Sequence, residues 1–287
     1  MDFKMFNIRF YNETGSITFG GGTSSSPWRL TAAEGLVFCG KTFVSASYAN
    51  CEGQQTTDIT ANARTITLSG DMRIEENFAE VYSAALAALE QEGTLETDTV
   101  LGKRRIKARC CDFRQTDRKG NYMLFAVQFL CDNPYFEDAV KTEVAVFKEI
   151  PMLDSDFSFP GMFSERISRK NVTYAGTAKT EPTFYINIDS GSSGENLLTI
   201  TNHTSGETLK FNYGAVLGES ITVDVENRKI YNANGESLIK YLADDCFFDG
   251  FHLYPGTNDI EIINCNMNTG ISVICSYSNK YSEAVHI

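Results

Sequence analysis

The sequence of 287 residues has no long apolar run, few histidines and a deficit of basic side chains. No stretch approaches the roughly 20 consecutive apolar residues that span a bilayer. Residues 1–15 lack the apolar core of a signal peptide, so we expect a protein that is made and kept in a cytosol. Twenty-five Lys and Arg against 37 Asp and Glu give a net charge of −12. This balance argues against a general nucleic-acid binder and against a protein that binds anionic membranes.

The spacing of the eight cysteines indicates neither a zinc site nor a disulfide framework. No two of them have the Cys-x-x-Cys spacing, and the adjacent Cys110 and Cys111 would point to opposite faces of a strand. We interpret all eight as free thiols, buried or half-buried, because free cysteine behaves as a small apolar residue. A metal site or a disulfide is the less favoured alternative. The eight are Cys39, Cys51, Cys110, Cys111, Cys131, Cys246, Cys265 and Cys275.

No group of residues has the spacing of a catalytic or metal-binding site. The three histidines, His203, His252 and His286, are far apart in sequence and suggest no triad. A group of aspartates lacks the glycine-spaced ligand pattern of a calcium loop, so we interpret it as part of a solvated loop. These aspartates are Asp244, Asp245 and Asp249. The sequence therefore predicts no catalytic, cofactor-binding or metal-binding residues, no cofactor, and a protein that is not an enzyme.

One stretch, Gly35–Thr42, matches the phosphate-loop pattern G-x-x-x-x-G-K-[ST]. That loop needs small, flexible residues that wrap a phosphate and a helix that begins at the lysine. Here residues 36–39 form an apolar run that we expect to be a strand, and residues 43–53 continue as strand and turn. We therefore reject nucleotide binding.

Residues 77–93 are the one stretch with a convincing helical period. Asn77 and Glu80 have the spacing of a capping box, and Gly93 is predicted to end the helix in a left-handed conformation. We expect the apolar stripe to pack on a sheet, with Leu86 among its buried residues. The stripe consists of Phe78, Val81, Tyr82, Ala85, Leu86 and Leu89.

The rest of the chain is typical of strands and turns. Residues 3–19 predict a hairpin with a turn at Asn12–Gly15. Residues 103–110 alternate, so Ile106, Ala108 and Cys110 share one face. The other face carries Arg105, Lys107 and Arg109, which with Lys103 and Arg104 form a predicted basic stripe. We interpret the stripe as an exposed sheet face, with contact to an acidic surface of a neighbouring subunit as the alternative.

The order of these parts resembles the distal tail protein (Dit) family of long-tailed bacteriophages. The resemblance begins with the strand RTITLSGDM, the helix, the basic strand and a strand that ends in Asn133-Pro134-Tyr135-Phe136. It continues through Phe157-Ser-Phe159-Pro160, which is similar to the interdomain segment of the family, and through Glu181-Pro182 before TFYINI. The loop GGGTSSS and the number of cysteines depart from the family pattern.

The resemblance implies a mainly β fold and a structural role in a virion. It implies a β-sandwich-like N-terminal domain with one packed α-helix over residues 1–140, which forms a ring. A linker over 141–175 leads to a galectin-like β-sandwich over 176–287. The expected function is a tail-tip or baseplate hub, a hexameric ring that joins the tail tube protein to the tail-associated lysin or tail fibre hub protein and to receptor-binding proteins. The expected location is the phage tail tip, with assembly in the host cytoplasm.

A carbohydrate-binding, lectin-like module for host attachment is the alternative function, because the second domain is expected to be galectin-like. Sugar sites usually stack the sugar on an aromatic ring, but the single tryptophan, Trp28, falls in the other domain. For a ring, the candidate contact segments are the hairpin 3–19, the loop Gly20–Pro27 and the basic stripe 103–109.

Overall fold

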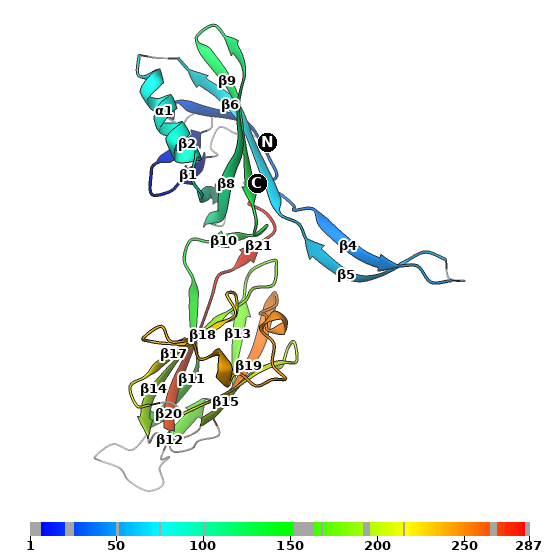
Figure 1. The fold of residues 1–287 in the computed structure, drawn as a ribbon, viewed down its shortest axis with the longest axis vertical. Helices are drawn as coiled ribbons and strands as arrows, with labels where there is room; N and C mark the ends of the chain where they lie inside the picture. Colours follow the sequence, from blue (N-terminus) through cyan, green and yellow to red (C-terminus); the bar gives the residue numbers. More distant parts are fainter. Residues whose placement is uncertain are drawn as a thin grey trace. The chain divides into compact units, whose positions relative to one another are not determined.

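The computed structural model describes residues 7–20, 26–49, 52–74, 76–99, 102–151, 164–167, 169–191, 196–214, 216–264 and 269–284. The chain forms two compact units (Figure 1). Unit 1 contains Met1–Ala139 together with Tyr281–Ile287, and unit 2 contains Val140–Lys280. The backbone therefore passes from one unit to the other twice.

Unit 1 is built around a nine-stranded sheet in the order β21-β10-β8-β7-β1-β2-β3-β6-β9. The 18-residue β8 pairs with β7 through its first half and with β9 through its second half, so the strands from β8 round to β9 close into a barrel. β2 and β3 are parallel, and the other described pairs of the sheet are antiparallel. The strands are β1 (Asn7–Tyr11), β2 (Ser16–Gly20), β3 (Trp28–Glu34), β6 (Arg64–Arg73), β7 (Gly93–Thr99), β8 (Gly102–Lys119), β9 (Tyr122–Cys131), β10 (Phe136–Asp138) and β21 (Lys280–Tyr281).

The core of unit 1 fills the barrel and extends under the single helix, α1 (Phe78–Leu89). Strand β9 alternates between fully and partly covered positions along its whole length, as expected for a strand with one face on a core. Aromatic rings dominate this core: Trp28 lies with its ring centroid 6.2 Å from that of Phe19 and 5.1 Å from that of Phe125. On the helix side, Tyr82 stacks on Trp28 at 6.4 Å.

The helix lies where the sequence predicts it, but three details of the prediction were wrong. Asn77 makes no side-chain capping bond. Gly93 is the first residue of β7 rather than a left-handed helix stop, and a side chain there would collide with the ring of Phe10 at 2.6 Å. Leu86 is 37% exposed, whereas Ala85, Ala88 and Leu89 are buried. The helix thus approaches the barrel most closely through Ala85, Ala88 and Leu89.

Unit 2 is a β-sandwich. A six-stranded sheet, β12-β11-β20-β14-β17-β18, faces a four-stranded sheet, β13-β19-β15-β16, and both contribute to one apolar core. For example, Phe184 and Ile186 from the first sheet and Ile260 and Ile262 from the second are all buried. The elements are β11 (Thr142–Pro151), β12 (Ser164–Ile167), β13 (Arg169–Tyr174), β14 (Thr183–Gly191), β15 (Asn196–Asn202), β16 (Glu207–Tyr213), β17 (Ser220–Asp224), β18 (Lys229–Asn232), η2 (Ile239–Tyr241), η3 (Phe248–Gly250), β19 (Gly256–Asn264) and β20 (Thr269–Tyr277).

The predicted fold class, mainly β with one packed helix followed by a β-sandwich, is confirmed, and the sheet of unit 1 is barrel-like. The predicted linker over residues 141–175 differs from the structure. Strands β11, β12 and β13 fall in this range, and β11 pairs with β20 while Val146 and Phe147 are buried. The proposed interdomain segment Phe157–Pro160 lies outside the described residues.

Candidate assembly interface

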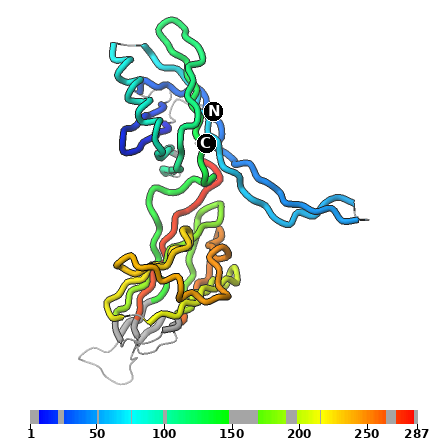
Figure 2. The backbone as a smooth tube through the Cα atoms, in the orientation of Figure 1, coloured from blue at the N-terminus to red at the C-terminus, as the bar shows by residue number. Residues whose placement is uncertain are grey.

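A two-stranded ribbon projects from the barrel of unit 1 (Figures 1 and 2). It consists of β4 (Lys41–Ala46) and β5 (Gln55–Ala61), which pair only with each other among the described strands. We refer to residues 41–61 as the arm. Phe43 and Ile59 are directly opposite one another and therefore share one face of the ribbon. Thr42 and Thr60 form the neighbouring pair and share the other face.

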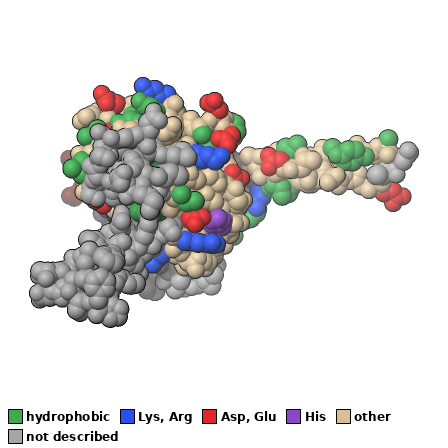
Figure 3. All heavy atoms as spheres, turned by 90° about the horizontal axis from the view of Figure 1, so that it is seen from below, with side chains coloured by type: hydrophobic (Ala, Val, Ile, Leu, Met, Phe, Trp, Pro, Cys, Tyr) green, Lys and Arg blue, Asp and Glu red, His purple; other side chains and the backbone are tan. Residues whose placement is uncertain are grey.

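The apolar side chains of the arm are uncovered. Phe43 is 57% exposed and Ile59 is 54% exposed. Val44 and Tyr48 are also more than half exposed, and hydrophobic side chains lie along the arm in Figure 3. An isolated two-stranded ribbon is only marginally stable in water, and exposed apolar pairs on it are typical of a surface that another chain covers. The arm is thus the clearest candidate for an assembly surface among the described residues of unit 1.

The residues that match a phosphate-loop pattern lie at the base of this arm. Residues 35–40 are bends and irregular backbone, so the predicted strand over 36–39 was wrong. No helix follows: β4 begins at Lys41, whose ammonium lies 5.1 Å from the ring centroid of Phe38. Val37 and Phe38 are each 61% exposed and extend the apolar surface of the arm toward the barrel.

The predicted contact hairpin is a structural part of the barrel. Phe10 and Ile17 are buried, and β1 pairs with β2 and β7 along its length. The side chain of Asn12 holds the turn by accepting from the N–H of Gly15 at 3.1 Å, and its amide donates to the carbonyl of Ala88 at 2.7 Å. Residues 3–6 of the predicted hairpin lie outside the described residues.

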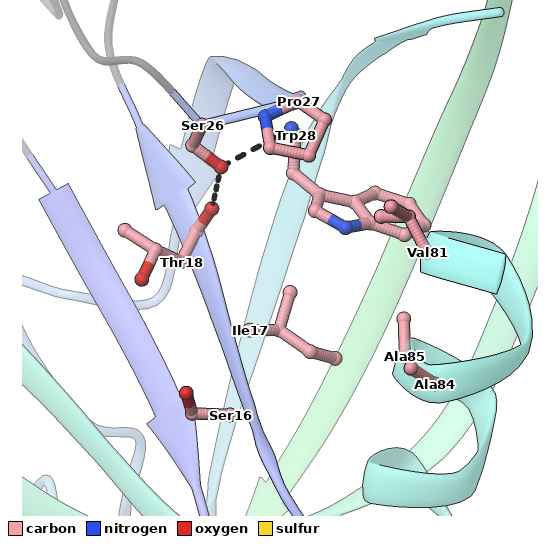
Figure 4. A pocket seen from close by; sticks show the side chains of 9 residues that line it. All are labelled: Ser16, Ile17, Thr18, Ser26, Pro27, Trp28, Val81, Ala84 and Ala85. Carbon is pink, nitrogen blue, oxygen red and sulfur yellow. Dashed lines mark hydrogen bonds between the residues drawn. The ribbon is translucent and has the colours of Figure 1, made fainter. Parts of the chain in front are cut away.

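Beside β2, an open cavity of about 430 Å³ separates that strand from α1 (Figure 4). Its lining is uncharged and includes the apolar side chains of Trp28, Val81 and Ile17. The hydroxyl of Ser26 donates to the carbonyl of Thr18 and accepts from the N–H of Trp28 (3.2 Å). Residues 21–25 of the predicted contact loop Gly20–Pro27 are outside the described part of the chain.

The basic stripe divides between the two faces of β8. Ile106 and Ala108 are buried as predicted, and Lys107 and Arg109 are exposed. Arg104, however, is only 5% exposed, because it shares the inward face with Ile106. Lys103 pairs with Glu96 at 2.9 Å, and Arg109 pairs with Asp132. The exposed stripe therefore contains fewer basic side chains than the sequence indicates, and two of them are paired with carboxylates.

Apart from His286, the histidines and aspartates considered as site residues are spread over unit 2. His203 pairs with Glu261 at 2.7 Å, and His286 is outside the described residues. Asp245 pairs with Lys210 and Asp249 with Arg228, each at 2.7 Å. No cluster of three or more possible metal ligands occurs within the described residues.

His252 belongs to a buried ionic group. Its Nε2 lies 3.2 Å from Glu181, whose other oxygen is 2.6 Å from the ammonium of the buried Lys280. Glu226 is 3.4 Å from the same ammonium. Burial alone would raise the pKa of Glu181, but the hydrogen bonds and charges of His252 and Lys280 outweigh it and lower the pKa to about 2. This group fixes the end of unit 2 where β20 leads into β21.

The six cysteines within the described residues are free thiols. Five are buried or half-buried as predicted, and burial raises the pKa of Cys131 to about 12 and that of Cys110 to about 11. Cys111 is exposed, which contradicts the prediction for this residue. Cys51 and Cys265 lie outside the described residues.

Comparison with known proteins identifies the kind of molecule to which this fold belongs. Residues 175–281 match the family model described as siphovirus-type tail component, C-terminal domain. The crystal structure of the SPP1 Dit (gp 19.1) protein, described as a paradigm of hub adsorption apparatus in Gram-positive infecting phages, has a TM-score of 0.65 to this chain at 13% identity. The match covers 96% of this chain and 99% of that one.

Weaker likenesses and negative results complete the comparison. A chain in the phage P2 baseplate in its activated conformation with Ca has a TM-score of 0.45 at 10% identity, covering 94% of this chain and 97% of that one, which is too low to support a conclusion. No curated protein sequence matches. In the described residues there is no helix with the length and apolar character needed to cross a bilayer. Residues 175–281 therefore match the C-terminal domain model of the siphovirus-type tail component family, and the chain as a whole has the fold of the SPP1 Dit protein.

Proposed function

We propose that this protein is a structural hub of a phage tail tip, in which six copies form a ring. Unit 1 makes the ring, and unit 2 carries adhesion components outward. The observation that carries the proposal is the arm, whose apolar pair Phe43 and Ile59 is more than half exposed on a chain with the distal tail protein fold. The number of subunits rests on the family resemblance.

A ring follows from the chemistry of such an arm. The arm and the surface that receives it are different parts of one chain, so the contact is heterologous and closes into a ring when the rotation between neighbours permits. A stable contact of this kind buries more than about 1,000 Å². Phe43, Ile59 and the neighbouring Phe38 supply the apolar centre that an interface needs.

The remaining partners follow from the place of a hub in a tail. One face of the ring contacts the tail tube protein, and the other contacts the tail-associated lysin or tail fibre hub protein and the receptor-binding proteins. The protein acts by geometry rather than by catalysis, in the virion, after assembly in the host cytoplasm. Residues Arg105 and Lys107 on β8 are secondary candidates for contact with an acidic neighbour.

The test compares two variants with the same net charge. Phe43→Lys/Ile59→Glu replaces the apolar pair by an oppositely charged cross-strand pair, and Thr42→Lys/Thr60→Glu places the same charges on the other face of the ribbon. Light scattering behind size exclusion should give the wild type a mass six times the 31.9 kDa of one chain. We expect the first variant to lose this mass and the second to keep it.

Two results would contradict the proposal. A wild-type protein that stays monomeric at every salt and protein concentration would remove self-assembly. An unchanged mass in the Phe43→Lys/Ile59→Glu variant would show that self-assembly does not depend on the apolar pair of the arm. The lectin alternative is tested separately by a glycan array with the full chain; Trp28 is 3% exposed in the core of unit 1 and is not available for sugar stacking.

A further inference from the structure

Four residues that follow unit 2 in sequence are built into unit 1. Tyr281 belongs to β21, which pairs with β10 at the end of the nine-stranded sheet, and Figure 2 shows this red segment returning to the body formed by the blue and cyan strands. Ala284 is fully buried, and its N–H donates to the carbonyl of Leu36 at 2.8 Å. We call residues 281–284 the clasp.

Two buried arginines hold the backbone of the clasp. Arg64 is 2% exposed, and its Nη2 donates to the carbonyl of Ser282 at 2.6 Å. The same guanidinium donates to the carbonyls of Gly35 and Pro134, each at 2.7 Å. Arg64 thus joins three distant parts of the chain. These three acceptors are neutral carbonyls, and burial lowers the pKa of Arg64.

Arg104 makes the second attachment. Its Nη1 donates to the carbonyl of Glu283 at 2.5 Å and lies 3.8 Å from the carboxylate of the same residue. The guanidinium carbon is 3.7 Å from the ring centroid of Tyr281, a cation–π contact, and the Tyr281 hydroxyl donates to Asp138 at 3.1 Å. The clasp is therefore attached through its backbone, its aromatic ring and its buried alanine.

Without the clasp, both guanidinium groups would lose a backbone acceptor, and Arg104 would also lose the ring that covers it. An unsatisfied buried donor carries the full desolvation cost, and this cost is larger for a charged group. The clasp also covers the site where Leu36 joins the barrel to the base of the arm. Residues 1–139 contain every strand of the closed barrel, but without the clasp the sheet lacks its edge strand β21 and the core lacks Ala284.

We propose that the clasp is the last piece of unit 1 to be added, so that unit 1 reaches its stable form only after unit 2 has been synthesised. Because a chain is made from its N-terminus, the arm emerges long before the clasp. Delayed completion of unit 1 would keep nascent arms from joining neighbours before unit 2 is in place. This last consequence rests on the proposed ring; the effect of the clasp on folding does not.

The single tryptophan makes the test specific to unit 1, because Trp28 is buried in the unit 1 core and unit 2 has no tryptophan. The test uses the full chain with Ala284→Asp, which places a charge at a fully buried position. Ala79→Asp, at an exposed position in the first turn of α1, is the matched control. Tyr281→Phe keeps the ring over Arg104, whereas Tyr281→Ala removes it.

We expect Ala284→Asp to lower the thermal midpoint followed by Trp28 fluorescence by about 10 °C or more, and Ala79→Asp to change it by less than about 2 °C. If Ala284→Asp does not fold, Tyr281→Ala should lower the midpoint more than Tyr281→Phe. A chain that ends at Lys280 should lose the Trp28 transition, and one that ends at Ala284 should keep it. In each case the unit 2 transition measured by calorimetry should remain.

An unchanged Trp28 transition in the chain that ends at Lys280, or in both Ala284→Asp and Tyr281→Ala, would overturn the inference. A parallel fall of the unit 1 and unit 2 transitions would also overturn it, because the clasp would then stabilise the whole chain rather than unit 1. Both readouts work on a monomer, so a failure of the proposed ring leaves this test intact. A negative result for the ring in the mass measurement therefore leaves the clasp untested, and a negative result for the clasp in the fluorescence measurement leaves the ring untested.

Discussion

Unit 2 encloses its core with consecutive residues, whereas unit 1 depends on residues that are distant in sequence. In unit 2 two sheets drawn from Val140–Lys280 share one apolar core. In unit 1 the barrel closes between β8 and β9, but the edge strand β21 is separated from the other strands of its sheet by unit 2 in sequence, and the arm leaves apolar side chains uncovered. Unit 1 therefore needs residues from both sides of unit 2 in sequence to complete its sheet.

The two units also bury their cations differently. Arg64 in unit 1 donates to three backbone carbonyls, which do not titrate. In unit 2 the ammonium of Lys280 faces the carboxylate of Glu181, which does titrate. The stability of unit 2 should therefore respond to acid through this group, and unit 1 should not respond through Arg64. The following experiments test whether the two units differ in these ways.

The largest effect is expected from the helix that covers the barrel. Leu89→Asp buries a charge in the unit 1 core and should lower the free energy of unfolding by about 4 kcal/mol. Leu86→Asp, on the 37% exposed position of the same helix, should lower it by less than about 1 kcal/mol. Urea unfolding followed by Trp28 fluorescence measures both. Equal losses in the two variants would show that the helix packs on a different face.

An intermediate effect is expected from the ionic group of unit 2. Glu181→Gln leaves His252 without its carboxylate partner and Lys280 with Glu226 alone, and should destabilise unit 2 by on the order of 2 kcal/mol at pH 7. Because the pKa of Glu181 is about 2 in the folded chain, below its unfolded value, its contribution is present above about pH 4.5 and is lost as the pH falls toward 2.

Calorimetry of the unit 2 transition between pH 7 and pH 2 gives the measurement. The gap between wild type and Glu181→Gln should narrow over the range from pH 4.5 to 2, while the Trp28 transition of unit 1 should be the same in both proteins. A gap that stays constant with pH would mean that the loss comes from packing rather than from the charge of Glu181.

The smallest effect concerns thiol reactivity and leaves stability unchanged. Among the six described cysteines, the exposed Cys111 should react first with iodoacetamide at pH 8, because burial raises the pKa of Cys110 and Cys131 and reduces their access. Peptide mass mapping after short labelling times identifies the site. Cys111→Ser serves as the control, and equally fast labelling of Cys131 would indicate that the closed barrel opens readily.

The sequence predicts elements better than it predicts their surroundings. The helix was correctly placed because its apolar period is strong, but the period cannot show that Ala85 and Ala88 face the barrel while Leu86 lies at the edge. The alternation of β8 predicts that Arg104 shares a face with Ile106. Arginine is usually exposed, so the sequence alone does not predict that Arg104 is buried. The carbonyl that accepts its hydrogen bond belongs to Glu283, 179 residues away.

The arm and the clasp show where sequence reasoning ends. Phe43 and Ile59 read as ordinary strand residues, and nothing local indicates that their strands pair outside the main sheet. Arg64 contacts Ser282 across 218 positions, a separation at which periodicity carries no information. The resemblance to the tail-component family was nevertheless visible in the sequence, because this resemblance depends on the order of the elements and not on their packing.

The double passage of the backbone has a mechanical consequence. A chain that crosses between its units once can be separated by a single cut, but this chain crosses near Ala139 and again near Tyr281. A force that pulls the units apart is divided between two covalent connections, which leave unit 1 from the neighbouring strands β10 and β21. One proteolytic nick within either connection would leave the other intact, so this chain would tolerate a cut that severs a singly connected protein.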